Sequence, residues 1–255
     1  MNAPQPLPLD EVRVWYRFTA AITDAEVEVL SALLSDDERA RARRFVFARD
    51  RRDFTAAHAL LRKSLSLYDS EVAPDAWILQ GADGHKPSIA APRTALAFNL
   101  SHTHGLVACA VARDTAVGVD VESIERLSSG RDIAQRFFSP FECRGLDACE
   151  PSAYTRRFIE LWTLKESYLK GIGTGLSHPL DNFSFDLDRS PAIAFVAPPD
   201  VNTADWQFML AAPAPNYRLA VAVRRTAATA RYRIVMHDAD AAASCEATML
   251  GESPR

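Results

Sequence analysis

Hydrophobic and polar residues alternate along much of the chain, and this alternation predicts short strands in both halves. A strand that buries one face places apolar residues at every second position. Segments typical of strands are 12–18, 77–79, 96–100, 106–112, 116–122, 183–187, 193–196, 206–210, 219–223 and 232–236. About the last fifteen residues, after His237, lack such a pattern and are expected to form a frayed tail.

Apolar residues at intervals of three and four predict two long helices, at about 50–68 and 152–172. Capping boxes, in which a glutamate follows a serine three positions later, predict helix starts at 35–38 and 139–142. The dipeptide at 113–114 predicts a tight hairpin between the strands on either side of it. Helices and strands therefore occur in mixed order in both halves, which indicates an α+β fold.

Composition and charge narrow the functional classes. The 255 residues are 48% hydrophobic and 24% charged, as is usual for a globular protein, and the net charge of −4 argues against a general nucleic-acid binder. The opening MNAPQPLPLD does not resemble a signal peptide, and no apolar run approaches the roughly 20 residues that span a bilayer. The four cysteines lack zinc-site spacing, so we expect reduced thiols in a cytoplasmic protein without membrane contact.

The segment GVDVE places two carboxylates in a strand that is otherwise rich in valine. Strand alternation puts Gly118, Asp120 and Glu122 on one face, with the two carboxylates about 7 Å apart, and the valines on the other. One interpretation is a half-buried strand with an acidic face in water. The other is a pair of oxygen ligands for a hard divalent cation, with the glycine marking a close approach of backbone or ligand.

The helix at 152–172 carries a lysine, Lys165, in the middle of its apolar stripe. A lysine there must either extend its ammonium group to solvent or meet an anion in a semi-buried site. Glu166 and Lys170 lie four residues apart on the flank of this stripe. They form either an ordinary surface ion pair or part of the same anionic site.

Further polar residues gather at turns. Ser101 and His102 end a predicted strand, where a hydroxyl, an imidazole and backbone N–H groups suit phosphate oxygens. The alternatives are a simple turn with an exposed histidine, or a zinc site with His104 that lacks further ligands. Arg49 and Lys86 add cations on other segments, and together these residues indicate a divalent ion with a phosphorylated ligand. No Walker or Rossmann glycine pattern is present.

Four segments in this order resemble the 4′-phosphopantetheinyl transferase family: FNLSHT, GVDVE, FFSPFE and WTLKESYLKGIGTGL. The family signature, G-[IV]-D-[IV]-E followed about forty residues later by W-x-x-K-E-[SA]-x-x-K, is complete at 118–122 and 162–170. The resemblance is to the larger, single-chain type that activates carrier proteins of peptide, polyketide and fatty-acid synthesis. It is clear from about residue 44 to 180 and weaker toward both ends.

The resemblance implies two similar α/β halves related by a pseudo-twofold axis, with coenzyme A in the cleft between them. The N-terminal half, 1–114, would contact the 3′-phosphate and pyrophosphate of coenzyme A. The C-terminal half, 115–255, would carry the metal site, the catalytic helix and the surface that docks the carrier protein. A monomer is expected.

Matching positions imply roles for the acidic strand and the long helix. Asp120, Glu122 and Glu166 would bind Mg²⁺, or Mn²⁺ in its place. Lys170 would contact the phosphates of coenzyme A and stabilise the leaving group, and Glu166 is the candidate base. Lys165 would hold a phosphate or Glu122 without being catalytic.

The same matching implies a binding site for coenzyme A. Ser101 and His102 would hold phosphate oxygens, while Arg49 and Lys86 would hold the adenosine end with its 3′-phosphate. The implied reaction moves 4′-phosphopantetheine from coenzyme A to a serine of an apo acyl or peptidyl carrier protein and releases adenosine 3′,5′-bisphosphate. The alternatives are a non-catalytic module that binds coenzyme A or a carrier protein, and a metal-dependent phosphodiesterase.

Overall fold

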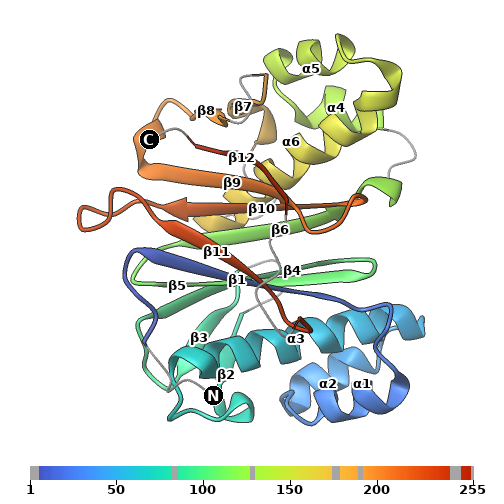
Figure 1. The fold of residues 1–255 in the computed structure, drawn as a ribbon, viewed down its shortest axis with the longest axis vertical. Coiled ribbons are helices and arrows are strands. Elements are labelled where there is room, and N and C mark those ends of the chain that lie inside the picture. The colour runs from blue at the N-terminus through green and yellow to red at the C-terminus, as the bar shows by residue number, and fades with distance from the viewer. Residues whose placement is uncertain are drawn as a thin grey trace.

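The computed structural model describes residues 6–81, 86–126, 130–173, 179–188, 192–241 and 248–253. Two four-stranded sheets lie next to each other at the centre of the molecule (Figure 1). The first has the strand order β11 (Arg233–Asp238), β1 (Glu11–Phe18), β5 (Leu106–Arg113), β4 (Leu96–Thr103). The second has the order β12 (Thr248–Glu252), β9 (Trp206–Ala212), β10 (Tyr217–Arg224), β6 (Val117–Ser123).

All neighbouring strands in these two sheets are antiparallel except β1 and β11, which are parallel. Two further sheets have two strands each, and they pair β2 (Ile78–Gln80) with β3 (Ser88–Ala91) and β7 (Ser184–Asp186) with β8 (Ala194–Val196). The α-helices are α1 (Asp24–Ser31), α2 (Asp36–Ala42), α3 (Ala48–Tyr68), α4 (Gly130–Phe137), α5 (Pro140–Asp147) and α6 (Pro151–Ile172). Short 3₁₀ helices are Pro74–Ala76, Ile124–Arg126, Leu180–Asn182 and Thr203–Asp205. The α+β prediction is confirmed.

Each large sheet has one long helix on its outer face, α3 on the first and α6 on the second (Figure 1). Strand alternation sorts the apolar residues accordingly. In β5, Val107 and Cys109 pack toward α3, whereas Leu106 and Ala108 join a cluster that draws residues from both sheets. The helix starts are also local in origin, because both predicted capping boxes are formed, at Ser35 and at Ser139.

The predicted hairpin at 113–114 is wrong. β5 belongs to the first sheet and β6 to the second, so the segment between them is a crossing from one sheet to the other. The physical reason is that β5 already pairs with β1 along one edge and with β4 along the other, which leaves it no free edge for β6. Asp114 adopts φ 54° in this crossing.

The predicted frayed tail is wrong for residues 248–253. They form β12, which pairs with β9, and Ser253 donates its backbone N–H to the carbonyl of Phe208. The Ser253 hydroxyl also accepts the N–H of Phe208 at 2.9 Å. Hydrogen bonds to the free edge of β9 therefore order this segment. Such bonds leave no hydrophobic pattern in the sequence, so the segment was not predicted as a strand. Within the described parts of the chain, no helix is long and apolar enough to cross a membrane.

Candidate active site

The site begins with the close approach of α6 to β6. A Cβ atom on Gly118 would lie 2.0 Å from the carbonyl oxygen of Ser167 and 2.4 Å from the backbone nitrogen of Gly171. The glycine predicted to mark a close approach therefore accommodates the backbone of α6. Because the helix lies this near, Glu166 and Lys170 stand beside Asp120 of β6.

Asp120 connects three elements of the structure. It is 3% exposed, and its Oδ1 accepts hydrogen bonds from Ser101 Oγ of β4 at 2.9 Å and from Lys170 Nζ of α6 at 2.6 Å. Lys170 Nζ also donates to Ser101 Oγ at 2.8 Å. The structure thus brings together Asp120, Ser101 and Lys170, three of the predicted site residues, from three different segments.

Two carboxylate oxygens at this point are buried without a hydrogen-bond partner, Asp120 Oδ2 and Glu166 Oε1. Burial, and then the negative charge of Asp120, raise the pKa of Glu166 to about 7 against the opposing charge of Lys170. Unpartnered buried carboxylates are costly, and oxygen atoms of this kind fit a hard divalent cation.

The third predicted ligand, Glu122, lies on the same strand and accepts a hydrogen bond from Thr103 at 3.4 Å. In the part of the chain that is described, no three His, Cys, Asp or Glu side chains stand together as a ready metal site. The two unpartnered oxygens of Asp120 and Glu166 fit Mg²⁺ as a partial set of ligands, which Glu122 does not complete in this structure. A cation of this type keeps several waters and takes further oxygens from substrate phosphates.

The raised pKa predicts how stability depends on pH. The native state keeps a proton on Glu166 up to about pH 7, whereas the unfolded chain loses it near pH 4.5. Between these values the native state binds more protons, so the free energy of unfolding decreases as pH rises and then levels off. We expect Glu166 to lower the free energy of unfolding by about 3 kcal/mol between pH 4.5 and pH 7.

The measurement compares urea unfolding of the wild type and Glu166→Gln from pH 4.5 to 8 in metal-free buffer. The substituted protein should lack this decrease, and the difference between the two curves isolates Glu166 from other titrating groups. Parallel pH profiles for the two proteins would contradict the assignment of the raised pKa to Glu166.

Lys165 meets an anion, as one alternative predicted, but the expectation that it holds a phosphate or Glu122 is wrong. Its side chain is fully buried, and its Nζ donates to the carbonyls of Leu180 at 2.7 Å and Phe183 at 2.6 Å. A third contact, 2.8 Å to Glu142 Oε2, completes its donors, so it holds neither Glu122 nor a phosphate, and it does not reach solvent. The anion it meets is a residue that the sequence indicated only as a helix cap.

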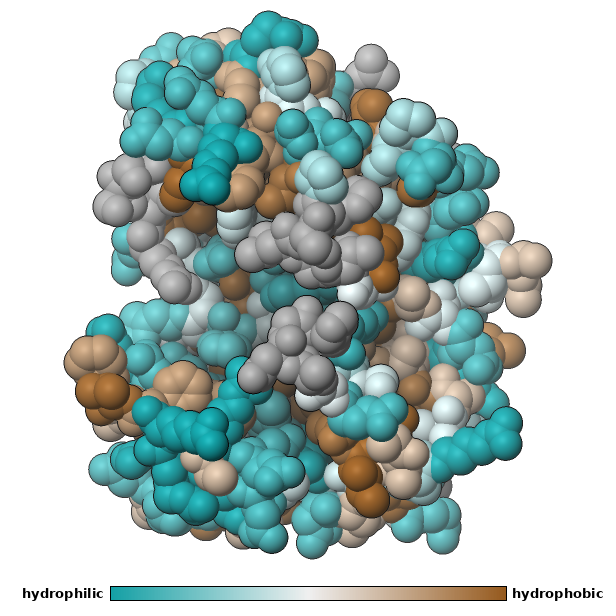
Figure 2. All heavy atoms as spheres, turned by 180° about the vertical axis from the view of Figure 1, so that it is seen from behind, coloured by the Kyte–Doolittle hydropathy of each residue, from teal (hydrophilic) through white to brown (hydrophobic). Residues whose placement is uncertain are grey.

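Two of the predicted ligands of coenzyme A, Arg49 and His102, line adjoining cavities. One, of about 560 Å³, is lined by Arg49 and His102 among others, and a second, of about 600 Å³, shares His102 and Phe45 with it. Figure 2 shows the surface hollowed at mid-height between the two halves, with polar residues in view there. Arg49 is exposed, and its guanidinium pairs with Asp50 at 3.5 Å.

Lys86 lines neither cavity, although Pro87 beside it lines the second. Its Nζ donates to the backbone carbonyl of Val117 at 2.7 Å, and burial lowers its pKa to about 8. The ammonium group is therefore held at the beginning of β6. His85, the residue before Lys86, lies outside the described residues.

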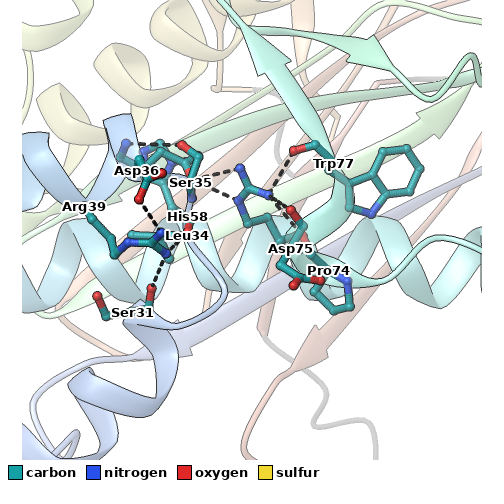
Figure 3. Close-up of polar contacts among 11 residues, drawn as sticks. Ser31, Leu34, Ser35, Asp36, Arg39, His58, Pro74, Asp75 and Trp77 are labelled. Atoms are coloured by element: carbon teal, nitrogen blue, oxygen red, sulfur yellow. Dashed lines mark hydrogen bonds and ion pairs between the residues drawn. The ribbon is translucent and has the colours of Figure 1, made fainter.

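A buried polar network beside the second cavity was missed by the sequence analysis (Figure 3). Glu38 accepts from Arg62 Nε at 2.9 Å and contacts His58 Nδ1 at 2.8 Å, while Arg62 also donates to the Trp77 carbonyl at 3.0 Å. Burial favours the neutral carboxyl, but His58 and Arg62 outweigh it and hold the pKa of Glu38 at about 2. The sequence feature that could have indicated this network is Arg62, which lies among the apolar residues of the helix predicted at 50–68.

Known proteins resemble this chain over most of its length. Residues 21–114 match the family model "4'-phosphopantetheinyl transferase, N-terminal", and residues 116–222 match "4'-phosphopantetheinyl transferase superfamily". The 4'-phosphopantetheinyl transferase HetI of Nostoc sp. (strain PCC 7120 / SAG 25.82 / UTEX 2576) is 34% identical over 217 residues, covering 84% of this chain and 88% of HetI. The chain belongs to the 4′-phosphopantetheinyl transferase superfamily.

A second relative agrees with this. The 4'-phosphopantetheinyl transferase Sfp of Bacillus subtilis (strain 168) is 32% identical over 178 residues, which are 69% of this chain and 77% of Sfp. A solved structure, a holo-(acyl-carrier-protein) synthase from Bacillus anthracis str. Ames in complex with CoA (3',5'-ADP), has a TM-score of 0.38 and 16% identity over 43% of this chain and 94% of that chain. The family resemblance seen in the sequence is confirmed, and the chain is an enzyme of the transferase class.

Proposed function

We propose that this transferase moves the 4′-phosphopantetheine group of coenzyme A to a serine of an apo acyl or peptidyl carrier protein, and releases adenosine 3′,5′-bisphosphate. The observation that carries the proposal is the pair of buried, unpartnered oxygens on Asp120 and Glu166 beside the ammonium group of Lys170. The two carboxylates carry more negative charge than the ammonium group of Lys170 balances. This excess favours the binding of a second cation, together with the phosphates that accompany it.

Asp120, Glu122 and Glu166 would hold Mg²⁺ or Mn²⁺, which when bound would neutralise charge on the pyrophosphate. Lys170 keeps its ammonium group at the site through Asp120 and Ser101. From this position it stabilises the charge that develops on the leaving phosphate.

Glu166 is the candidate general base. With no cation bound its pKa is about 7, so it takes a proton more readily than an ordinary glutamate. Because an oxygen that binds Mg²⁺ cannot also take the proton, this role falls to the carboxylate oxygen of Glu166 that the metal leaves free. It would accept the proton of the carrier serine directly or through a water molecule as the serine oxygen attacks the β-phosphate. The hydrogen bond that the Ser101 hydroxyl donates to Asp120 keeps the Asp120 carboxylate oriented during the step.

The cavities support a place for the rest of coenzyme A. Arg49 and His102 line the cavity of about 560 Å³. Ser101 and His102 would bind the phosphate oxygens of coenzyme A. Arg49 and Lys86 would hold the adenosine end, for which Lys86 must exchange the Val117 carbonyl for a phosphate oxygen. We further propose the division into halves at 114/115 and a monomer in the cytoplasm that uses no nucleic acid or membrane.

A mass measurement tests the proposal. The protein is incubated with coenzyme A, Mg²⁺ and each member of a panel of apo carriers from fatty-acid, polyketide and peptide synthesis. We expect at least one carrier to gain the mass of phosphopantetheine. If coenzyme A is bound and no carrier gains mass, the protein is a binding module, and if coenzyme A is cleaved without a gain, it is a phosphodiesterase.

A further inference from the structure

The two edge strands at the centre of the molecule, β4 and β6, lie side by side without a backbone ladder (Figure 1). Each is the last strand of its sheet, and none of the strand pairings within the described residues joins them. The edge of β6 that faces β4 therefore presents backbone N–H groups with no strand partner. Buried N–H groups without a partner are costly, so side chains must accept these bonds.

A row of polar side chains on β4 supplies the acceptors. Asn99, Ser101 and Thr103 occupy alternate positions and so share one face of the strand, and they are 4%, 4% and 2% exposed. Asn99 Oδ1 accepts the N–H of Val119 at 2.9 Å, and Ser101 Oγ accepts the N–H of Val121 at 3.2 Å. Side chains thus take the place of backbone carbonyls across the junction of the sheets.

The row also touches the carboxylates of the candidate site. Ser101 donates to Asp120, and Thr103 donates to Glu122. Asn99 bonds instead to the backbone of Val119, the residue before Asp120. It brings no group to the reacting atoms, but it fixes the strand from which both carboxylates project.

We propose that Asn99 is a positioning residue for the metal-binding carboxylates, a role that rests on the proposed transferase function. Its amide oxygen replaces a missing backbone rung and holds β6 in register with β4. A directional hydrogen bond in a buried setting fixes position more tightly than apolar contact does. Asp120 and Glu122 are thereby kept opposite Ser101 and Thr103.

Two variants that differ by one oxygen atom test this role. Asn99→Ala removes the acceptor and leaves the Val119 N–H buried and unpaired. Asn99→Ser returns an acceptor, and Ser101 shows that a serine of this row reaches an N–H of β6. Val111→Ala is the matched control, because Val111 lies opposite Phe98 on β5, is 0% exposed, and packs in the cluster beneath α3.

The readouts are independent of turnover. Hydrogen exchange follows the Val119 amide, and paramagnetic resonance follows Mn²⁺ binding with coenzyme A present and carrier protein absent. We expect Asn99→Ala to speed Val119 exchange and to raise the Kd for Mn²⁺, each by about tenfold. Asn99→Ser should lie within about threefold of the wild type, and Val111→Ala should lower the Tm while leaving both readouts unchanged.

Three results would overturn the role of Asn99. They are rapid Val119 exchange in the wild type, metal binding that is equal in the Asn99→Ala and Asn99→Ser variants, and metal binding weakened as much by Val111→Ala as by Asn99→Ala. The first needs no variant, so it decides the matter even if Asn99→Ala does not fold. Carrier modification by the wild type is measured separately, so a failure of the proposed function is distinguished from a failure of this inference.

Discussion

Replacing Asp120 with alanine is expected to lower Mg²⁺-dependent transfer to a carrier protein by at least about a thousandfold. The substitution removes one of the two unpartnered carboxylate oxygens and also the anion that holds Lys170 in place. Rates with saturating coenzyme A and carrier protein, together with a thermal melt, measure the effect. The melt should show a folded chain, because the lost interactions lie in the candidate site and not in the hydrophobic clusters of the sheets.

Two companion variants sharpen this result. Asp120→Asn keeps the shape of the side chain and loses its charge, so it should lose nearly as much activity as the alanine variant. Asp188→Ala removes an exposed aspartate that pairs with Arg157 at 3.6 Å, and it should leave the rate within about twofold. Activity that survives Asp120→Ala would show that the metal is held elsewhere.

Gly118→Ala should destabilise the protein by about 3 kcal/mol or more. The added methyl group would lie 2.0 Å from the Ser167 carbonyl oxygen, and the atoms it meets are backbone atoms of α6. The helix must move away from β6, which also carries Glu166 and Lys170 away from Asp120. Denaturant unfolding measures the loss of stability, and the transfer rate should fall with it.

Gly145→Ala provides the matched control. Gly145 lies in α5, and a Cβ atom there meets nothing within 4 Å. Alanine favours a helix over glycine, so this variant should be neutral or more stable by up to about 1 kcal/mol. If Gly118→Ala were as stable as Gly145→Ala, the close approach of α6 to β6 would not exist as described.

Local patterns predicted the parts of the fold that depend on neighbours in the sequence. The alternation in GVDVE predicted Gly118 and Asp120 on one face of the strand and the valines on the other. The structure confirms this division and shows that the first face meets α6 and that the second lies between the sheets. The capping boxes at Ser35 and Ser139 formed because each needs only four consecutive residues. The family motifs identified the superfamily for the same reason, since each lies within a short segment.

Features that depend on distant partners were not predictable in the same way. Lys165 stood out on its helix, but its partner Glu142 is carried by another helix and could not be read from spacing. The sheet to which β5 belongs is decided by β1, far away in the sequence. Asn99 gave no signal by itself, because its acceptor role exists only where β4 meets β6.

The most direct test of the central claim measures both products of one reaction mixture that contains wild-type protein, coenzyme A, Mg²⁺ and an apo carrier. Holo carrier and adenosine 3′,5′-bisphosphate should form in equal amounts, and both should stop when EDTA removes the metal or when the acceptor serine of the carrier is changed to alanine. Release of the bisphosphate with the carrier that lacks its acceptor serine would contradict the account, because water would then be the acceptor.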